Sequence, residues 1–549
     1  MNVTVDHLDI GSESSWNYSL VTLVFSLVAL ALAHFYHETS HTARLGNQIP
    51  GPKSLPFIGN FMVIWGLKGN HHAFKRAMKL SRMFGRIVRG WVGWKLLVVI
   101  WNPEDVEVIL NSQVHIDKSD EYRFFKPWLG NGLLISTGEK WRTHRKLIAP
   151  AFHMNVLKSF VPTFNENSKK VIKRLRMEVG NEFDCHDHMS EATVDILLST
   201  AMGFKKTDKQ KEMSAFKYAM AVMKMCDIIH KRHLKFWYRL NWLYNLSSFK
   251  KVEEKCLSVI HGFTNKVLSQ RRNDFNENLK KGNLPMPSLQ DIIKTAPKND
   301  PADGLRDDLD DIDENDVGEK RRLAFLDLMI ETSHYNPSQI SDLEIQQQVD
   351  TIMFEGHDTT AAGSSFFLCM MGCHPDIQEK VYQEQKAIFG DSGRDCTFSD
   401  TLEMKYMERV IFETLRMYPP VPVIARKVNQ DVKLSSENYT IPAGSTVLIG
   451  TYKIHRTPEN FPNPDTFDPD NFLPEKTANR HYYSFIPFSA GPRSCVGRKY
   501  AMLKLKVLLS TIVRNFKVKS LVKEEDFKLM GDIILKRSDG FQIVLEERN

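Results

Sequence analysis

The sequence predicts a mainly α-helical protein with small β-sheets, tethered by one N-terminal membrane helix. Three observations lead to this fold class. Residues 14–33 form a run of twenty residues without a formal charge, long enough as a helix to cross a bilayer core of roughly 30 Å. Residues 155–280 and 341–373 show the apolar spacing of helices. Residues 85–101, rich in valine, isoleucine and tryptophan, predict a β-hairpin interrupted at Gly93.

The first 60 residues predict an anchor followed by a spacer. We place a short luminal N-terminus at residues 1–15, a transmembrane anchor at 16–36 and a proline-rich hinge at 37–60. Aromatic residues at both ends of the apolar run are typical of membrane interfaces. Acidic residues before the run and basic residues after it favour a cytosolic body. A cleaved signal peptide is the alternative, which the acidic leading segment disfavours.

The net charge of +7 conceals an acidic segment. Residues 300–320 hold ten acids and two bases, whereas the rest of the chain holds 71 bases and 56 acids. Residues 284–320 therefore predict an insertion that does not join the core, either a solvated loop or a docking site for a basic partner. The basic remainder suits anionic lipid or an acidic protein partner. Nothing resembles a zinc module or an RNA-binding signature, so we expect no nucleic-acid partner.

One cysteine has unusual surroundings. The seven cysteines are odd in number and scattered, which argues against a disulfide framework and for a reducing cytosol. Cys495 lies in the run Phe-Ser-Ala-Gly-Pro-Arg-Ser-Cys-Val-Gly at residues 488–497, where the glycines allow a tight turn and close approach of a flat ligand. A helix predicted from Arg498 to about Arg514 would point its N-terminal N–H groups at the sulfur and favour the thiolate. Such a thiolate suits the proximal ligand of a haem iron; a buried structural cysteine is the alternative.

A long helix is predicted after Ser341. Ser341 and Glu344 form a capping box, and the apolar pattern continues to Cys373, before Pro375. In its middle the chain reads Glu-Gly-His-Asp-Thr-Thr at residues 355–360. Glycine, an acid and two threonines are costly inside a helix, and such departures from local preference often mark function. A kink packed by threonines is the alternative interpretation.

Two further pairs are placed by helical spacing. Trp141 and Arg145 are four residues apart, so both lie on one face of a predicted helix. An indole N–H beside a guanidinium suits a porphyrin propionate, although alone the pair is more often a surface cation–π contact. Glu413 and Arg416 predict an ion pair on a helix stopped by Pro419.

Together and in this order, the motifs resemble the cytochrome P-450 superfamily over residues 50 to about 545. The resemblance implies the P-450 fold, with residues 61–549 as one haem-thiolate catalytic domain that holds a b-type haem. It implies that Cys495 is the axial ligand of the haem iron and that Asp358 and Thr359 supply protons for oxygen activation. It also implies haem-binding roles for Trp141, Arg145, Arg426, Phe488, Gly491 and Arg493.

The resemblance also implies that Glu413 and Arg416 brace the haem loop. In the family a later arginine completes this brace, whereas here the corresponding segment, Phe467–Phe472, has Asn471. The departure puts the third member of the brace in doubt. We expect Asn471 to bond Arg416 or Glu413 as a neutral partner.

Glu355 narrows the resemblance to family four, the fatty-acid ω-hydroxylase group. In that family this glutamate can form an ester with a haem methyl group. The acidic insertion, together with Asp470 and Asn471, most resembles the insect subfamily G. These enzymes are oxidative decarbonylases that convert long-chain aldehydes into cuticular hydrocarbons. A fatty-acid ω-hydroxylase is the close alternative, and a non-catalytic haem sensor or electron carrier is a more distant one.

The same resemblance implies membrane and protein partners. Electrons would come from NADPH through cytochrome P-450 reductase, with O₂ as oxidant. Basic residues flank the haem motifs and could meet an acidic surface of the reductase: Lys140, Arg142, Arg145, Lys146, Arg498 and Lys499. The implied location is the endoplasmic reticulum membrane, with the catalytic domain in the cytosol, in contact with lipid and a long-chain aliphatic substrate.

Overall fold

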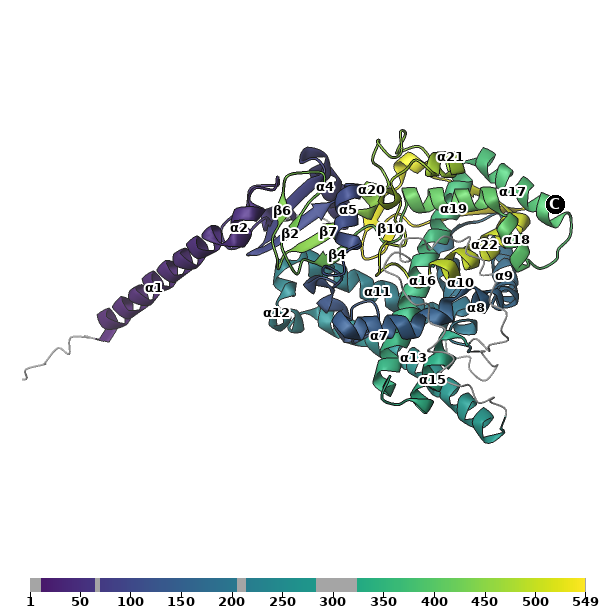
Figure 1. Ribbon diagram of the computed structural model, residues 1–549, viewed down its shortest axis with the longest axis horizontal. Coiled ribbons are helices and arrows are strands. Elements are labelled where there is room, and N and C mark those ends of the chain that lie inside the picture. Colours follow the sequence, from purple (N-terminus) through teal and green to yellow (C-terminus); the bar gives the residue numbers. More distant parts are fainter. Residues whose placement is uncertain (1–10, 65–69, 205–213, 283–322, 549) are drawn as a thin grey trace, which may run out of the picture.

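The computed structural model describes residues 11–64, 70–204, 214–282 and 323–548. Helix α1 projects as a long arm from a helical body that contains small sheets (Figure 1). The predicted insertion at 284–320 and most of the predicted luminal segment lie outside the described residues.

Helices dominate the described residues. Their bounds are α1 Gly11–Thr39, α2 His41–Gly46, α3 Phe61–Ile64, α4 Asn70–Met83, α5 Pro103–Leu110, α6 Lys126–Leu129, α7 Gly138–Ile148, α8 Met154–Lys158, α9 Val161–Leu175, α10 Cys185–Ser199, α11 Ala215–Leu234, α12 Asn241–Asn245, α13 Ser248–Lys280, α15 Phe325–Tyr335, α16 Asp342–Cys373, α17 Pro375–Phe389, α18 Phe398–Glu403, α19 Lys405–Met417, α20 Thr451–Ile454, α21 Pro474–Thr477 and α22 Arg498–Asn515.

The strands are short and form four small sheets. Their bounds are β1 Ile87–Val92, β2 Lys95–Ile100, β3 Glu182–Asp184, β4 Ile424–Lys427, β5 Val432–Lys433, β6 Thr440–Ile441, β7 Thr446–Ile449, β8 Phe516–Ser520, β9 Leu529–Gly531, β10 Leu535–Arg537 and β11 Gln542–Glu547. The four-stranded sheet has the order β1-β2-β7-β4, in which only β2 and β7 run parallel. The predicted hairpin is β1–β2, and Gly93 turns it with φ of +60°, a left-handed conformation that favours glycine.

Helix α1 extends beyond the apolar run that predicted it. Residues Tyr18–Thr39 are long and apolar enough to cross a membrane, and none of these residues is buried as a whole, although the last turns contact the body. The helix ends at Thr39, where Ser40 caps α2 by accepting the backbone N–H of Ala43 at 3.1 Å. Helical structure thus continues into the segment predicted as the hinge.

Helix α16 passes through the middle of the body, as the capping box and apolar period predicted. Ser341 and Glu344 cap each other reciprocally, and the helix ends just before Pro375. It packs against α10, α13, α19, α22 and β8. Between residues 348 and 371 every side chain is buried except at Glu355, Gly356 and Thr359. The rest of this stretch therefore belongs to the core, and one short face does not.

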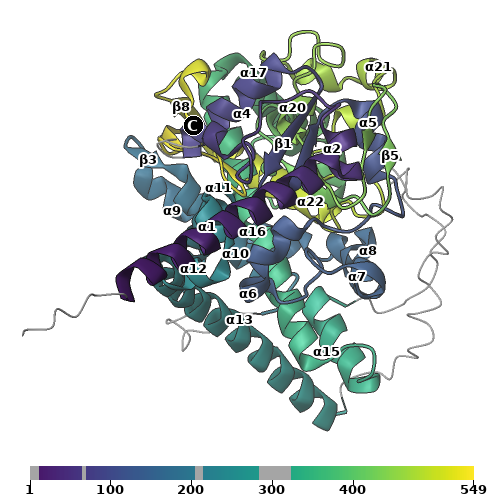
Figure 2. The same ribbon diagram turned by 90° about the vertical axis from the view of Figure 1, so that its left-hand side faces the viewer.

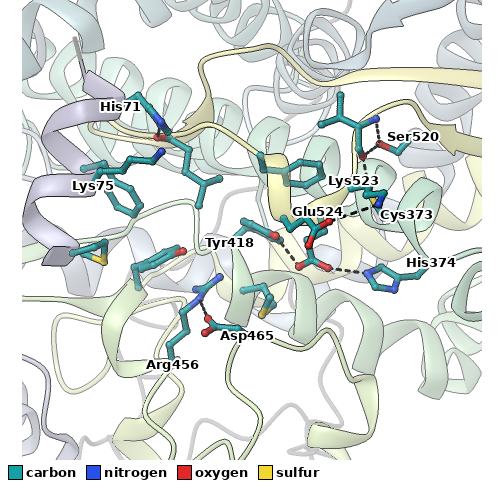
Figure 3. A pocket seen from close by; sticks show the side chains of 18 of the residues that line it. His71, Lys75, Cys373, His374, Tyr418, Arg456, Asp465, Ser520, Lys523 and Glu524 are labelled. Carbon is teal, nitrogen blue, oxygen red and sulfur yellow. Dashed lines mark hydrogen bonds and ion pairs between the residues drawn. The ribbon is translucent and has the colours of Figure 1, made fainter. Parts of the chain in front are cut away.

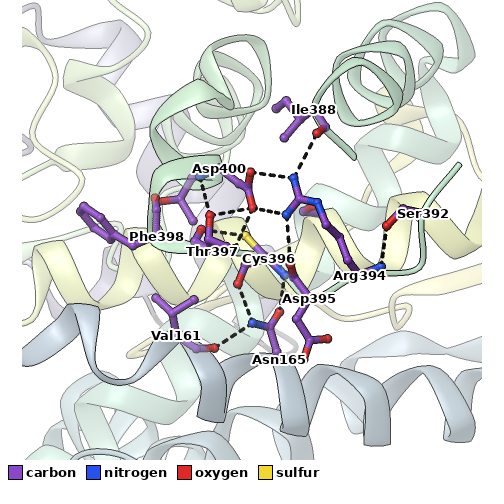
Figure 4. A network of polar contacts seen from close by, with 12 residues as sticks. Val161, Asn165, Ile388, Ser392, Arg394, Asp395, Cys396, Thr397, Phe398 and Asp400 are labelled. Atoms are coloured by element: carbon purple, nitrogen blue, oxygen red, sulfur yellow. Dashed lines mark hydrogen bonds and ion pairs between the residues drawn. The ribbon is translucent and has the colours of Figure 1, made fainter. Parts of the chain in front are cut away.

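A polar network fixes the segment between α17 and α18 (Figure 4). Arg394 donates to both carboxylate oxygens of Asp400 at 2.6 and 2.9 Å, and Thr397 forms a capping box with the same aspartate. Asn165 of α9 donates to the carbonyl of Cys396 at 2.7 Å and accepts its N–H at 3.1 Å. These bonds tie the start of α18 to α9 and so help to set where α19 begins.

Candidate active site

The Cys495 loop is a tight turn that leads directly into α22. The backbone N–H of Cys495 donates to the carbonyl of Phe488 at 2.9 Å, which closes the loop. Gly491 has φ of +71°, and a Cβ there would overlap the carbonyl oxygen of Leu110 at the end of α5. Only glycine fits that position. The loop therefore presents its cysteine from a rigid backbone.

The exposed surface of Cys495, together with its dense surroundings, indicates an enclosed space inside the body. Cys495 is the only exposed cysteine of the seven, yet protein atoms surround it closely enough that burial raises the pKa of its thiol to about 11. The nearby Glu355 carboxyl also raises it, while the N–H of Gly497 and the charges of Arg145 and Arg498 lower it. The N–H of Gly497, at the start of α22, does lower the pKa of the thiol, as expected. In the protein alone, however, desolvation has the larger effect and favours the thiol over the thiolate.

The open face of α16 borders the same space. Glu355, Gly356 and Thr359 occupy positions i, i+1 and i+4, and the influence of Glu355 on Cys495 shows that the two side chains are close. Burial raises the pKa of Glu355 to about 7, against the attraction of Lys118, Arg145 and Arg493. In the described part of the chain, no side chain forms a hydrogen bond or ion pair with its carboxyl group.

Four cations from distant segments gather on this side of the site. Lys118, Arg145 of α7 and Arg493 of the cysteine loop act on the Glu355 carboxyl, and Arg426 of β4 lies close to Lys118 and Arg493. Arg426 is only 1% exposed, and among the described residues its guanidinium forms one hydrogen bond, from Nη1 to the carbonyl of Ala425 at 3.1 Å. Its Nη2 atom is buried without a partner. A buried guanidinium in this state requires an acceptor that the described side chains do not supply.

Arg493 lies over the indole ring of Trp141. Its guanidinium carbon is 5.0 Å from the ring of Trp141, and it donates to the carbonyls of Ile116 and Leu134, each at 3.2 Å. Burial and the nearby charge of Arg426 lower the pKa of Arg493 to about 9. Trp141 thus stacks on Arg493, a cation far away in sequence. The spacing of Trp141 and Arg145 could not predict this contact.

Lys118 was missed by sequence reasoning. Burial, Arg426 and Arg493 lower its pKa well below the usual value, and its ammonium donates to the hydroxyl of Tyr122 at 3.3 Å. It lies in an irregular segment with no periodic pattern, so no local signal marked it.

Asp358 and Thr359 point in different directions, because successive helix positions lie about 100° apart. The Thr359 hydroxyl is on the open face and donates to the carbonyl of Glu355 at 2.7 Å. Asp358 is completely buried and accepts from Lys536 of β10 at 2.8 Å. Burial opposes ionisation of Asp358, but Lys536, His357 and His186 hold its pKa below the usual value. The threonine borders the enclosed space, whereas the aspartate belongs to an ion pair behind it.

A buried lysine supports α16 at the same level. Lys504 of α22 is fully buried and donates to the carbonyl of Gly356 at 2.7 Å and to the hydroxyl of Thr360 at 2.8 Å. Burial lowers its pKa to about 7. Since α22 also begins at the cysteine loop, Lys504 links the two walls of the site.

We expect Lys504 to make stability depend on pH. A lysine in the unfolded chain titrates near ~10.4, so from about pH 7 upward the unfolded state binds more protons than the folded state. Stability contributed by this group therefore rises between about pH 7 and pH 10 in the wild type and not in Lys504→Met. Thermal unfolding at several pH values measures the difference, with the exposed Lys517→Met as the matched control. A wild-type-minus-variant difference that stays constant with pH would contradict this expectation.

The predicted brace is present and fully buried. Glu413 and Arg416 form two parallel hydrogen bonds of 2.7 Å, and both side chains are 0% exposed. The remaining guanidinium N–H groups donate to backbone carbonyls, among them Pro464 at 2.7 Å and His455 at 3.0 Å. The pair therefore ties α19 to the segment that precedes the cysteine loop.

Asn471 is the neutral partner that the sequence suggested. Its side-chain amide donates to Glu413 Oε1 at 3.2 Å. Arg480 in turn donates to the Asn471 carbonyl at 2.8 Å. Burial lowers the pKa of Arg480 and the charge of Glu413 raises it, so the two groups are close. A cation nine residues later compensates in part for the arginine that the family usually has at this position.

A separate surface pocket of about 1260 Å³ lies between α4 and the segment that joins β8 to β9 (Figure 3). Glu524 accepts the hydroxyl of Tyr418 at 2.8 Å and pairs with His374 at 2.9 Å. None of the predicted site residues lines this pocket. It is distinct from the space at Cys495.

Comparison with known proteins identifies the family. Residues 49–545 match the family model described as Cytochrome P-450. The chain is a cytochrome P-450. This P-450 is 52% identical to cytochrome P-450 4g15 of Drosophila melanogaster over the whole of both chains, and 54% identical to cytochrome P-450 4g1 of the same species over 96% of this chain and 94% of the relative. Human cytochrome P-450 4V2 is 38% identical over 84% of this chain and 82% of its own. The P-450 therefore belongs to family four, subfamily G.

Membership confirms the predicted mainly helical fold and identifies the protein as a haem-thiolate monooxygenase, so the non-catalytic alternatives are set aside. Haem is the group that the family implies, and this site fits it. One cysteine is open to the enclosed space, and the buried Arg426 has a donor without an acceptor. Cations grouped in this way suit the two carboxylates of a porphyrin. The family also implies a hydrophobic substrate and a reductase as redox partner, and α1 is consistent with a membrane anchor.

Proposed function

We propose that this P-450 carries out oxidative decarbonylation of long-chain aliphatic aldehydes. Membership of subfamily G supports the proposal most directly. In the overall reaction an aldehyde, O₂, two electrons and two protons give a hydrocarbon one carbon shorter, carbon dioxide and water. NADPH supplies the electrons through cytochrome P-450 reductase.

The haem would be held at its iron and at its propionates. Cys495 would ligate the iron, from a loop shaped by Phe488 and Gly491. The propionates would be held by side chains that converge on one side of the site: Lys118, Trp141, Arg145, Arg426 and Arg493. When bound, haem supplies the oxygen chemistry of the reaction. The protein contributes position, charge and exclusion of water.

Thr359 has the best placement for handling a proton. Its hydroxyl borders the site, and rotation away from the Glu355 carbonyl would let it donate inward. Asp358 is held ionised by Lys536 and does not face the site. In this geometry it would influence proton handling from the opposite side of α16. The otherwise buried surface of α16 keeps bulk water from this face.

An apolar surface near the anchor supports a lipid-like substrate. Large apolar side chains are exposed on and around α12, including Trp242 at 64% and Leu246 at 81%. Figures 1 and 2 show α12 on the side of the body from which α1 projects. Such a surface suits a part of the body that dips into the membrane over the substrate entrance. We place the anchor in the endoplasmic reticulum membrane with the body in the cytosol.

Basic side chains would receive the reductase. Lys140 already pairs with Glu344 at 2.8 Å, and Arg142 lies 3.6 Å from Glu139. Both pairs are solvent-accessible. Lys140 and Arg142 could therefore leave these carboxylates and pair with acidic residues of the reductase at a small cost in free energy. Lys146, Arg498 and Lys499 extend the same basic group.

The test uses the membrane-bound protein with reductase, NADPH and a long-chain aldehyde, analysed by gas chromatography and mass spectrometry. An NADPH-dependent hydrocarbon one carbon shorter than the substrate is the expected product. In Thr359→Ala, NADPH consumption should exceed product and peroxide should rise. Terminally hydroxylated or carboxylic products alone would instead favour a fatty-acid ω-hydroxylase, the activity implied by the family-four glutamate.

We expect Glu355 to hold part of the haem covalently. Its carboxyl faces the site without a side-chain partner among the described residues and has a pKa of about 7, so its neutral and ionised forms are both available. After denaturing extraction of the wild type, some haem should remain with the polypeptide. All haem should leave Glu355→Ala. Complete release from the wild type would show that the ester is absent.

A further inference from the structure

The last turns of α1 carry three potential metal ligands that the proposed reaction does not use. His34, His37 and Glu38 are spaced i, i+3 and i+4, so they lie on one helix face. One ligand atom from each lies within 4.8 Å of the other two. The group stands where the anchor meets the catalytic body.

Ring contacts hold the two imidazoles, and three of their four nitrogens have no hydrogen-bond partner in the part of the chain that the structure describes. The ring of His37 meets Trp91 edge-on at 5.1 Å and stacks on Trp94 at 5.7 Å, and His34 lies 5.2 Å from Phe57. Both ring nitrogens of His37 and Nδ1 of His34 are buried and unpaired. Buried polar atoms without partners are rare in proteins and often indicate an ion or water.

The carboxylate of Glu38 completes the group. Its Oε1 is 3.6 Å from Nδ1 of His37, close to the ~3.4 Å that separates two ligands of one tetrahedral zinc ion with bonds of about 2.1 Å. Its Oε2 accepts from the side-chain amide of Asn47 at 3.4 Å, a contact that orients the carboxylate as outer-shell partners commonly do. Arg89 of β1 lies near Glu38, and its positive charge would offset the negative charge of that carboxylate. The metal ion must therefore be held by its bonds to the three ligands rather than by a net negative charge at the site.

We propose that His34, His37 and Glu38 bind a Zn²⁺ ion at the junction of anchor and body. Two imidazoles and one carboxylate suit zinc, whereas Mg²⁺ and Ca²⁺ prefer oxygen ligands. The cation stands at the C-terminal end of α1, where the helix dipole favours positive charge. Because all three ligands come from adjacent turns of α1, the ion fastens the end of this helix in helical form, and it fixes the His37 ring that packs on Trp91 and Trp94 of the β1–β2 hairpin.

The full-length holoprotein in detergent micelles tests the site. After treatment with a chelator and dialysis against micromolar Zn²⁺, elemental analysis should give one zinc for each haem iron. X-ray absorption at the zinc edge should show two imidazoles and oxygen ligands at about 2.0–2.2 Å. His34→Ala and His37→Ala should each weaken zinc binding more than about tenfold, since even the loss of an outer-shell partner costs that much.

Matched variants separate this site from general chelation. His72→Ala removes an exposed histidine from α4 and should leave zinc binding unchanged. A retained reduced-CO spectrum shows that each variant is folded. Zinc should also slow hydrogen exchange at the amides of residues 35–39 in the wild type and not in His37→Ala. Absence of zinc at micromolar concentration, or equal binding by all the variants, would overturn the proposal.

Discussion

Replacing Cys495 with serine is expected to abolish the reduced-CO absorption that thiolate-bound haem gives, together with turnover. The side chain is the one exposed thiol among the seven and faces the enclosed space bordered by α16. Burial raises its pKa in the protein alone, so as the proposed iron ligand it would lose its proton through the energy of coordination. A serine hydroxyl is a much weaker acid and cannot replace the thiolate.

Cys373→Ser is the matched control for this variant. Cys373 is partly buried at the end of α16 and donates to the carbonyl of Val522 at 3.4 Å, in contact with none of the four cations near Glu355. It should retain the spectrum and the activity. An unchanged spectrum in Cys495→Ser would remove the ligand assignment.

Replacing Arg416 with methionine is expected to be the most destabilising of the substitutions considered. The change leaves the carboxylate of Glu413 buried with only the N–H of Asp468 and the amide of Asn471 to stabilise it. Removing one partner of a buried ion pair costs about 3–5 kcal/mol. Thermal unfolding followed by loss of haem absorbance measures the effect, and weak haem retention should accompany it.

The exposed pair Glu139–Arg142 provides the control for this prediction. It has the same i,i+3 spacing, but both side chains are solvent-accessible. Arg142→Met should therefore cost less than about 0.5 kcal/mol. Asn471→Ala removes one hydrogen bond to Glu413 and should cost about 1 kcal/mol. If Arg416→Met and Arg142→Met were equally stable, the brace would have no structural importance.

Local signals predicted much of this fold and part of its site. The capping box and apolar period located α16, the strand-rich run located the β1–β2 hairpin, and the i,i+3 spacing located the Glu413–Arg416 pair. Each of these features depends on residues close together in sequence. Their order along the chain then indicated the family.

Partners far apart in sequence could not be predicted. Lys536 reaches Asp358 across 178 positions, and Lys504 reaches Thr360 across 144. Lys504 looks like a solvated position on an amphipathic helix, because its burial is set by α16 packing over α22 and not by its neighbours in sequence. For the same reason, sequence spacing placed Trp141 and Arg145 on one helix face but gave no sign of the contact between Trp141 and Arg493.

The unbroken course of α1 has a consequence for lipid composition. The stretch that is apolar enough to cross a membrane and the turns that contact Phe57, Trp91 and Trp94 belong to one helix. A helix longer than the local hydrocarbon thickness adapts by tilting. Because the body is attached to the end of α1, each change in the tilt of this helix moves the α12 surface toward or away from the lipid headgroups. Bilayer thickness would then regulate how deeply the α12 surface enters the membrane. A thin and a thick membrane would therefore give the enzyme access to aliphatic substrates of different chain length.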